Sequence, residues 1–238
     1  MANLESLPSD LLYEILLKIS SNSYADLCLA KVSSKTLNNI SNEAGFLRNV
    51  DLINIILPWK WDVHGRVGAF FSRCLAAGNP SAQLRRGLSL IFFEHNLQAG
   101  CDFIQMASDN GFLMGKYCHT MLHLTMDGTS EVFNSVKALS REDAKKMRLT
   151  MEKIFMPAFN FQKPEELVEM VFQAYKKSLS TRICGCLKVP DMQWMGDEYL
   201  LETYGDQLCE SCFWKLECAN LWWVVPSFAM DWPRFLHQ

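Results

Sequence analysis

Long apolar runs and an excess of basic charge are both missing from this chain of 238 residues. A membrane-spanning helix needs about 18 or more consecutive apolar residues, and no stretch of the sequence approaches that length, so we expect no membrane partner. Acidic residues number 26 and basic residues 23, and the net charge of −3 offers no attraction for nucleic acid. Glu5 and Asp10 lie in the N-terminal stretch, which therefore does not resemble a secretory signal.

The nine cysteines are an odd number, which does not suit a secreted domain held together by disulfide bonds. We expect reduced thiols and a cytoplasmic or nuclear location. Apolar residues form 49% of the chain and charged residues 21%, a composition typical of globular proteins. A chain of this length buries enough surface to fold without disulfide bonds.

Motifs for catalysis and nucleotide binding are also missing. The sequence has no G-x-S-x-G, no phosphate loop and no G-x-G-x-x-G. His119 and His123 have a spacing that can hold a metal on a helix, but Thr120 stands where the metalloprotease pattern needs Glu. Cys118 and His119 are neighbours in sequence and would not face each other on a helix. We therefore expect no catalysis and interpret the two histidines as residues of a repeat helix.

Residues 1–50 predict three short helices. The first carries an apolar stripe at spacings of one, three and four residues, formed by Leu11, Leu12, Ile15, Leu16 and Ile19. Ser23 and Asp26 resemble a capping box at the start of the second helix, and Leu37 and Ile40 indicate a third. Three such helices share little internal core, so we expect them to dock on another surface.

Residues 67–180 predict a helical-repeat domain, joined to the first module by a bridge at residues 51–66. The segment Ala76–Phe92 is similar to Ser108–Leu124, and the equivalent glycines at positions 78 and 111 are 33 residues apart. The equivalent pairs are Gly78 and Gly111, Ala82 and Gly115, Leu84 and Tyr117, and Leu88 and Met121. Small residues one turn after a helix-breaking Gly let two helices approach closely, and a period in this range is typical of helix-turn-helix repeats.

Residues 181–238 form a Cys- and Trp-rich segment in which helical periodicity fades. Two tight cysteine pairs occur here, Cys184-x-Cys186 and Cys209-x-x-Cys212, and four thiolates suit tetrahedral zinc. A metal would also explain how a segment without a long amphipathic element holds together. We predict one structural zinc ion on these four cysteines. The alternative is that they are small buried thiols among tryptophans.

The first fifty residues resemble an F-box. The opening motif of that family, a Leu-Pro pair, an acidic residue with paired leucines, and Glu-Ile-Leu, reads here Leu7-Pro8, Asp10-Leu11-Leu12 and Glu14-Ile15-Leu16. The apolar run of the family's second helix is matched from Asp26 to Lys35, and Leu37 stands where the family often has Trp. The stretch Ala107–Gly115 is similar to Sel-like repeats of the tetratricopeptide superfamily, and Cys209–Trp214 resembles the tail of a plant F-box subfamily.

The resemblance implies a mainly α fold, with a three-helix F-box module, a tetratricopeptide-like middle and a small, irregular Cys-rich C-terminal unit. F-box modules dock on the Skp-type adaptor of cullin-RING ubiquitin ligases, while the rest of the chain captures a protein substrate. The chain would then be a non-catalytic substrate-recognition subunit of a Skp–cullin–F-box ubiquitin ligase. The residues expected to contact the adaptor are Leu7, Pro8, Leu11, Leu12, Ile15, Leu16, Val32 and Leu37.

The alternative is a helical-repeat scaffold unrelated to ubiquitylation, whose F-box-like helices pack inside the chain. A third and weaker interpretation is a metal-dependent or nucleic-acid-binding module built on the cysteine pairs, which the slightly acidic net charge disfavours. Exposure separates the first two, because a receptor chain without its partner should present an apolar patch on its N-terminal module.

Overall fold

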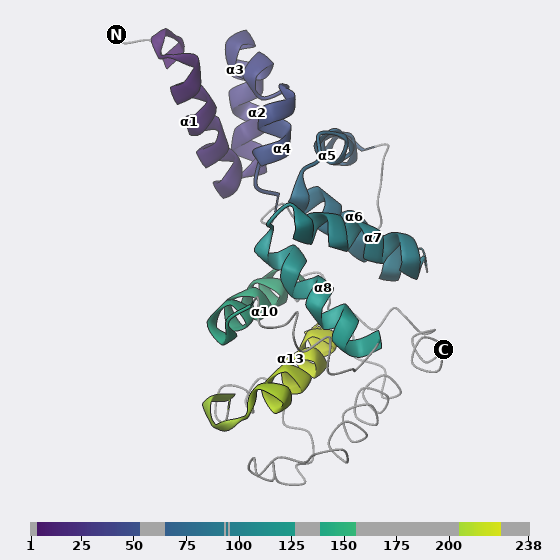
Figure 1. The fold of residues 1–238 in the computed structure, drawn as a ribbon. Coiled ribbons are helices and arrows are strands. Elements are labelled where there is room, and N and C mark those ends of the chain that lie inside the picture. The colour runs from purple at the N-terminus through teal and green to yellow at the C-terminus, as the bar shows by residue number, and fades with distance from the viewer. Residues whose placement is uncertain are drawn as a thin grey trace. The chain divides into compact units, whose positions relative to one another are not determined.

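The structure is a computed structural model that describes residues 4–52, 65–92, 94, 96–126, 139–155 and 205–224 (Figure 1). Every regular element in these residues is a helix, which confirms the predicted mainly α fold. The chain divides into two compact units, unit 1 (Met1–Lys116) and unit 2 (Tyr117–Gln238). Among the described helices, none combines the length and apolar character needed to cross a membrane.

The N-terminal module contains four short α-helices in its described part, one more than the sequence predicts. They follow a 3-10 turn, η1 (Leu4–Ser6), and are α1 (Ser9–Asn22), α2 (Tyr24–Ser33), α3 (Lys35–Ile40) and α4 (Ala44–Asn49). The predicted cap is confirmed, since the Ser23 hydroxyl accepts a hydrogen bond from the Asp26 N–H at 3.2 Å. Helix α4 is too short to show a periodicity, and its Gly45 has a low helix propensity, so the sequence pattern missed it.

The repeat region reproduces the predicted 33-residue period. Its described helices are α5 (Arg66–Ala76), α6 (Pro80–Phe92), α7 (Leu97–Asp109) and α8 (Leu113–Met126). The ends of α5 and α7, and the starts of α6 and α8, are each 33 residues apart. Gly78 and Gly111 occupy the same position in the two turns, with φ of 77° and 78°. An L side chain rarely adopts such angles, so glycine is needed at both turns.

Helices α6 and α7 pack against each other at very close range because each presents a glycine to the other. A Cβ added to Gly87 would lie 2.7 Å from the carbonyl oxygen of Gly100, and one added to Gly100 would lie 2.8 Å from that of Gly87. The predicted small residue Gly115 acts in the same way, because its Cβ would meet the Ala107 carbonyl carbon at 2.8 Å. Small side chains therefore set the spacing of the repeat helices.

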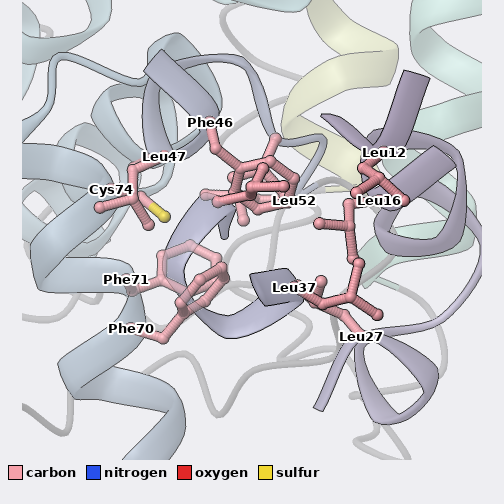
Figure 2. Close-up of a cluster of buried hydrophobic side chains, with 13 residues drawn as sticks. Leu12, Leu16, Leu27, Leu37, Phe46, Leu47, Leu52, Phe70, Phe71 and Cys74 are labelled. Carbon is pink, nitrogen blue, oxygen red and sulfur yellow. The ribbon is translucent and has the colours of Figure 1, made fainter. Parts of the chain in front are cut away.

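One continuous apolar core links the N-terminal module to the first repeat. Figure 2 shows leucines of α1, α2 and α3 on one side and aromatic residues of α5 on the other. The fully buried members include Leu16, Leu27, Phe46 and Phe71. The expectation that the short helices dock on another surface is met within unit 1, where their core extends to α5.

Asn79 adds a polar connection at the same junction. Its side chain is buried, and Nδ2 donates hydrogen bonds to the carbonyl oxygens of Leu47 at 2.9 Å and Val50 at 2.8 Å. Its Oδ1 accepts from the Ala82 N–H at 3.0 Å, which caps the start of α6. One side chain thus satisfies carbonyl groups at the end of α4 and an amide at the start of α6.

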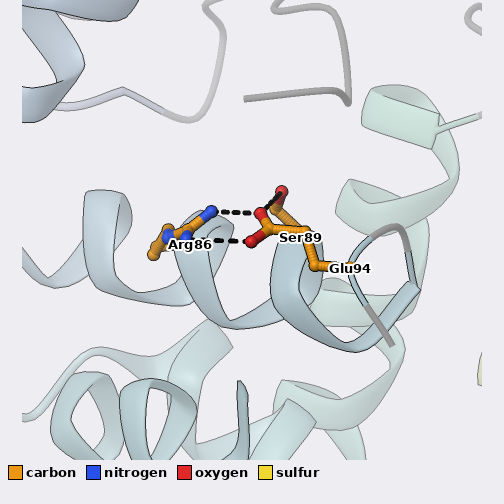
Figure 3. Close-up of polar contacts among 3 residues, drawn as sticks. All are labelled: Arg86, Ser89 and Glu94. Carbon is orange, nitrogen blue, oxygen red and sulfur yellow. Dashed lines mark hydrogen bonds and ion pairs between the residues drawn. The ribbon is translucent and has the colours of Figure 1, made fainter. Parts of the chain in front are cut away.

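The end of α6 is fixed by a partly exposed ion pair. Figure 3 shows Arg86 and Ser89 turned toward Glu94, which follows the helix. Arg86 forms a two-pronged contact with the Glu94 carboxylate, with Nη2 to Oε2 at 3.1 Å, and the Ser89 hydroxyl donates to Oε1 at 3.4 Å. A pair this exposed contributes about 0–1 kcal/mol, so it orders the turn more than it stabilises the unit.

Part of the C-terminal segment, for which the sequence predicts an irregular structure, is helical in unit 2. Besides the end of α8, its described elements are α10 (Arg141–Phe155), a 3-10 turn η3 (Gly205–Gln207) and α13 (Glu210–Val224). Helix α13 packs on α10. It is apolar on most of its circumference and so lacks the alternation from which an amphipathic helix is predicted. Residues 205–224 lie in the same compact unit as α10.

Candidate functional site

Exposed apolar side chains gather on the N-terminal module. Among the described residues, the large apolar side chains that are exposed are Leu4, Leu7, Leu11, Leu29, Val32 and Met106. All except Met106 lie in η1, α1, α2 or the turn between η1 and α1. We call these five residues the N-terminal apolar surface. Single exposed apolar residues are ordinary, but five within one small module are typical of an interaction site.

Helical spacing places Leu29 and Val32 together, since they are three residues apart on α2. Leu11 lies in the first turn of α1, and Leu7 precedes that helix by two residues. Residues three or four apart share one helix face. Val32 is 83% exposed and Leu29 is 63% exposed, so this face of α2 contributes little to the core. Helices α1 and α2 thus have apolar residues on both their inner and their outer faces.

The structure divides the predicted adaptor contacts into two groups. Leu7, Pro8, Leu11 and Val32 are exposed. Leu12, Leu16 and Leu37 are buried in the core, and Ile15 is half-buried. The apolar stripe predicted on the first helix is therefore mainly the inner face of α1. Sequence analysis missed Leu4 and Leu29, although the three-residue spacing from Leu29 to Val32 could have indicated a second face.

Polar contacts hold the inner side of α2 against the repeats. Lys31 Nζ donates to Asn42 Oδ1 at 3.1 Å and lies 5.5 Å from the centre of the Phe70 ring. Arg73 Nη2 donates to the same Asn42 oxygen at 3.0 Å. Burial lowers the pKa of Lys31, and the nearby charge of Arg73 lowers it further. With α2 fixed on this side, Leu29 and Val32 are held facing outward.

A buried polar network connects three helices of unit 2. The Glu217 carboxylate of α13 accepts a hydrogen bond from the Tyr117 hydroxyl of α8 at 2.7 Å and one from Arg148 Nη1 of α10 at 2.6 Å. All three side chains are buried. Burial raises the pKa of Glu217, while the charge of Arg148 and both hydrogen bonds oppose that rise. Burial and the nearby carboxylate also raise the pKa of Tyr117.

This network was not predicted from the sequence. The repeat pattern relates Tyr117 only to Leu84, and no sequence pattern relates Arg148 to Glu217. The usable signal was Glu217 itself, an acidic residue within the apolar sequence of α13. Because both neighbours donate hydrogen bonds to its carboxylate, the network attaches α13 to α8 and α10.

The predicted zinc ligands lie partly outside the described residues. Cys184 and Cys186 are not described, whereas Cys209 is half-buried just before α13 and Cys212 is buried in its first turn. Within the described part of the chain, no three His, Cys, Asp or Glu side chains come together as metal ligands. The four-cysteine zinc site stays a prediction.

Comparison with known proteins agrees with the repeat and F-box patterns. Residues 53–157 match the family of plant tetratrico peptide repeats. Two Arabidopsis thaliana proteins named as F-box proteins are similar to the chain. The first is 26% identical over 161 residues, which is 67% of this chain and 53% of that protein. The second is 29% identical over 132 residues, which is 55% of this chain and 79% of that protein.

The resemblance to a plant F-box protein with helical repeats is confirmed. The match spans only about half the length of the first F-box relative. The repeat family covers α5 to α10 and ends before α13, even though α13 packs on α10. No solved structure matches the chain.

Proposed function

We propose that this chain is a substrate-recognition subunit of a Skp–cullin–F-box ubiquitin ligase, without catalysis of its own. The observation that carries the proposal is the N-terminal apolar surface, which lies on the part of the chain that resembles an F-box. The two Arabidopsis thaliana proteins that are similar to this chain and are named as F-box proteins support the same interpretation. The repeats of residues 53–157 and the attached α13 would then supply the surface that captures a protein substrate.

The partner of the N-terminal apolar surface would be the apolar groove of a Skp-type adaptor. Helices that present leucine and valine outward are suited to a partner groove, because burial of those side chains contributes roughly 1.5–3 kcal/mol each. The inner faces of α1 and α2 are already occupied by the core, so adaptor binding needs no rearrangement of Leu12 or Leu16.

The test is a binding measurement between the purified chain and a Skp-type adaptor. Leu29→Asp combined with Val32→Asp should weaken binding at least tenfold without unfolding the chain, because both side chains are exposed. Met106→Asp is the matched control, since Met106 is 47% exposed but lies on α7. Equal weakening by the control would show that the effect is not specific to the N-terminal apolar surface.

The scaffold alternative also has a specific observation in its favour. The core of the N-terminal helices continues into α5, so these helices have a structural role inside the chain whether or not an adaptor binds. A folded wild-type chain that does not bind the adaptor would favour the scaffold function. Binding that depends on Leu29 and Val32 would exclude it as the main function.

A further inference from the structure

Two histidines of α8 face each other in a way that the proposed function does not use. The Nε2 atoms of His119 and His123 are 3.0 Å apart, and the ring centres are 4.4 Å apart. Both side chains are half-buried. At this distance one Nε2 carries a hydrogen and donates it to the lone pair of the other. Two imidazole nitrogens on successive turns of α8 are therefore already close together.

We propose that His119 and His123 form a two-nitrogen site for a late transition-metal ion, with nickel(II) and copper(II) preferred over zinc(II). Imidazole nitrogens bind such ions at about 2.0–2.1 Å, so a 3.0 Å separation gives a nitrogen–metal–nitrogen angle of roughly 95°. Adjacent ligands in square-planar or tetragonal coordination subtend about 90°, the geometry typical of nickel(II) and copper(II). Tetrahedral zinc would need the nitrogens to be about 3.4 Å apart.

The proton balance of binding is simple. The metal takes the position of the shared hydrogen, so the ring that carried it on Nε2 must change to the form with hydrogen on Nδ1. That ring releases one proton from Nε2 and takes up one on Nδ1, with water as the carrier, and both rings stay neutral. Both Nε2 lone pairs then bind the ion. Because the helix fixes the spacing of residues four apart, the pair is held ready before the metal arrives.

Among the described residues, no third His, Cys, Asp or Glu joins the pair as a metal ligand, so we assign the remaining coordination positions to water. Both histidines are half-buried, so part of each residue is accessible to water. Two protein ligands give weaker binding than a closed structural site with four. The site would therefore respond to metal concentration, and binding should raise the melting temperature of unit 2, because a ligand that binds only the folded state stabilises it.

The test uses the full chain without a histidine tag and with its thiols reduced. Nickel(II) is the probe, because copper(II) oxidises thiols and the chain has nine cysteines. Because the reduced thiols can also bind nickel, calorimetric titration should show, besides any binding by thiolates, one nickel ion whose binding His119→Gln or His123→Gln weakens at least tenfold. His237→Gln is the matched control and should leave binding unchanged. A sulfur-to-nickel charge-transfer band that is absent, or that is unchanged in both variants, would show that thiols do not hold this ion.

A second measurement on the wild-type chain guards against variants that fail to fold. Nickel(II) should slow the modification of His119 and His123 by diethyl pyrocarbonate at least tenfold, and should not slow that of His237. Failure of the wild-type chain to bind nickel, or unchanged binding in both variants, would overturn the proposal. Zinc binding that is tighter than nickel binding and lost in the same variants would overturn the assigned geometry.

Discussion

Unit 1 and unit 2 hold their helices together in different ways. In unit 1 the N-terminal helices meet α5 through an apolar core. In unit 2 the helices α8, α10 and α13 meet at the buried Glu217 carboxylate. Stabilisation by apolar contact is non-directional and increases with the buried area. A buried ion pair costs desolvation energy and is favourable only when its partners lie in a defined geometry. The burial of apolar surface therefore stabilises unit 1, and we infer that the buried network selects the position of α13 in unit 2.

Disrupting the buried network of unit 2 should destabilise the chain more than any other substitution considered below. Glu217→Gln removes the charge while keeping the shape, and it leaves the Arg148 guanidinium buried without its carboxylate. Loss of one partner of a buried pair costs about 3–5 kcal/mol. Chemical denaturation followed by circular dichroism should show the lower free energy of unfolding.

A compensating variant sharpens this prediction. A triple variant replaces all three polar partners together, by Tyr117→Phe, Arg148→Met and Glu217→Leu. It leaves no polar group of the network buried without a partner. Buried ion pairs can often be replaced by apolar residues without loss of stability, so most of the lost free energy should return. If the triple variant is as unstable as Glu217→Gln, the network contributes stability of its own and the contrast with unit 1 is weaker than we infer.

The next prediction compares one substitution on the two faces of the N-terminal module. Leu16→Ala removes a side chain with no exposed surface and should lower the free energy of unfolding by about 2–5 kcal/mol. Leu29→Ala makes the same change at a side chain that is 63% exposed, and surface changes of this kind stay within about 0.5 kcal/mol. The measurement is denaturant unfolding of both variants. Comparable losses would mean that the outer face of α2 is part of the core.

Helical repetition in unit 1 was predictable because it depends on local pattern. The offset from Gly78 to Gly111 fixed both the turns and the helix starts, and the structure places both glycines at positive φ. The Ser23 cap was also local and was found. The fourth helix of the N-terminal module was not predicted, because α4 is too short to show a period. The sequence also did not show which residues of the apolar stripe on α1 are buried, since Leu11 and Leu12 are neighbours of the same type and only Leu12 faces the core.

Unit 2 was less predictable because its contacts join residues far apart in sequence. Tyr117 and Glu217 are 100 residues apart, and Arg148 and Glu217 are 69 apart. The pattern of apolar residues within one helix cannot indicate which residues of distant helices contact each other. Helix α13 was hidden for a second reason, because its apolar residues surround the helix and erase the stripe that marks a half-buried one.

A smaller effect is expected where unit 1 depends on close backbone contact. Gly87→Ala gains about 1 kcal/mol of helix propensity, but its methyl group would meet the Gly100 carbonyl oxygen at 2.7 Å. Overpacking costs about 1–3 kcal/mol and should outweigh the gain. Gly45→Ala is the matched control, because nothing lies within 4 Å of its added Cβ. Thermal unfolding should show a lower melting temperature for the first variant and an unchanged or higher one for the second.

The smallest loss of stability is expected at the exposed ion pair of unit 2, between Arg141 and Glu210, in contrast to the buried pair formed by Glu217. Glu210 is paired with Arg141 Nη2 at 2.8 Å, but its side chain is 70% exposed. Its other oxygen accepts from Trp214 Nε1 at 2.9 Å, and Gln at this position can still accept that bond. Glu210→Gln should therefore lower the free energy of unfolding by at most about 1 kcal/mol, and added salt should shrink the difference. A loss as large as that of Glu217→Gln would show that burial does not distinguish the two pairs, and the specific role we give to the Glu217 network would fail.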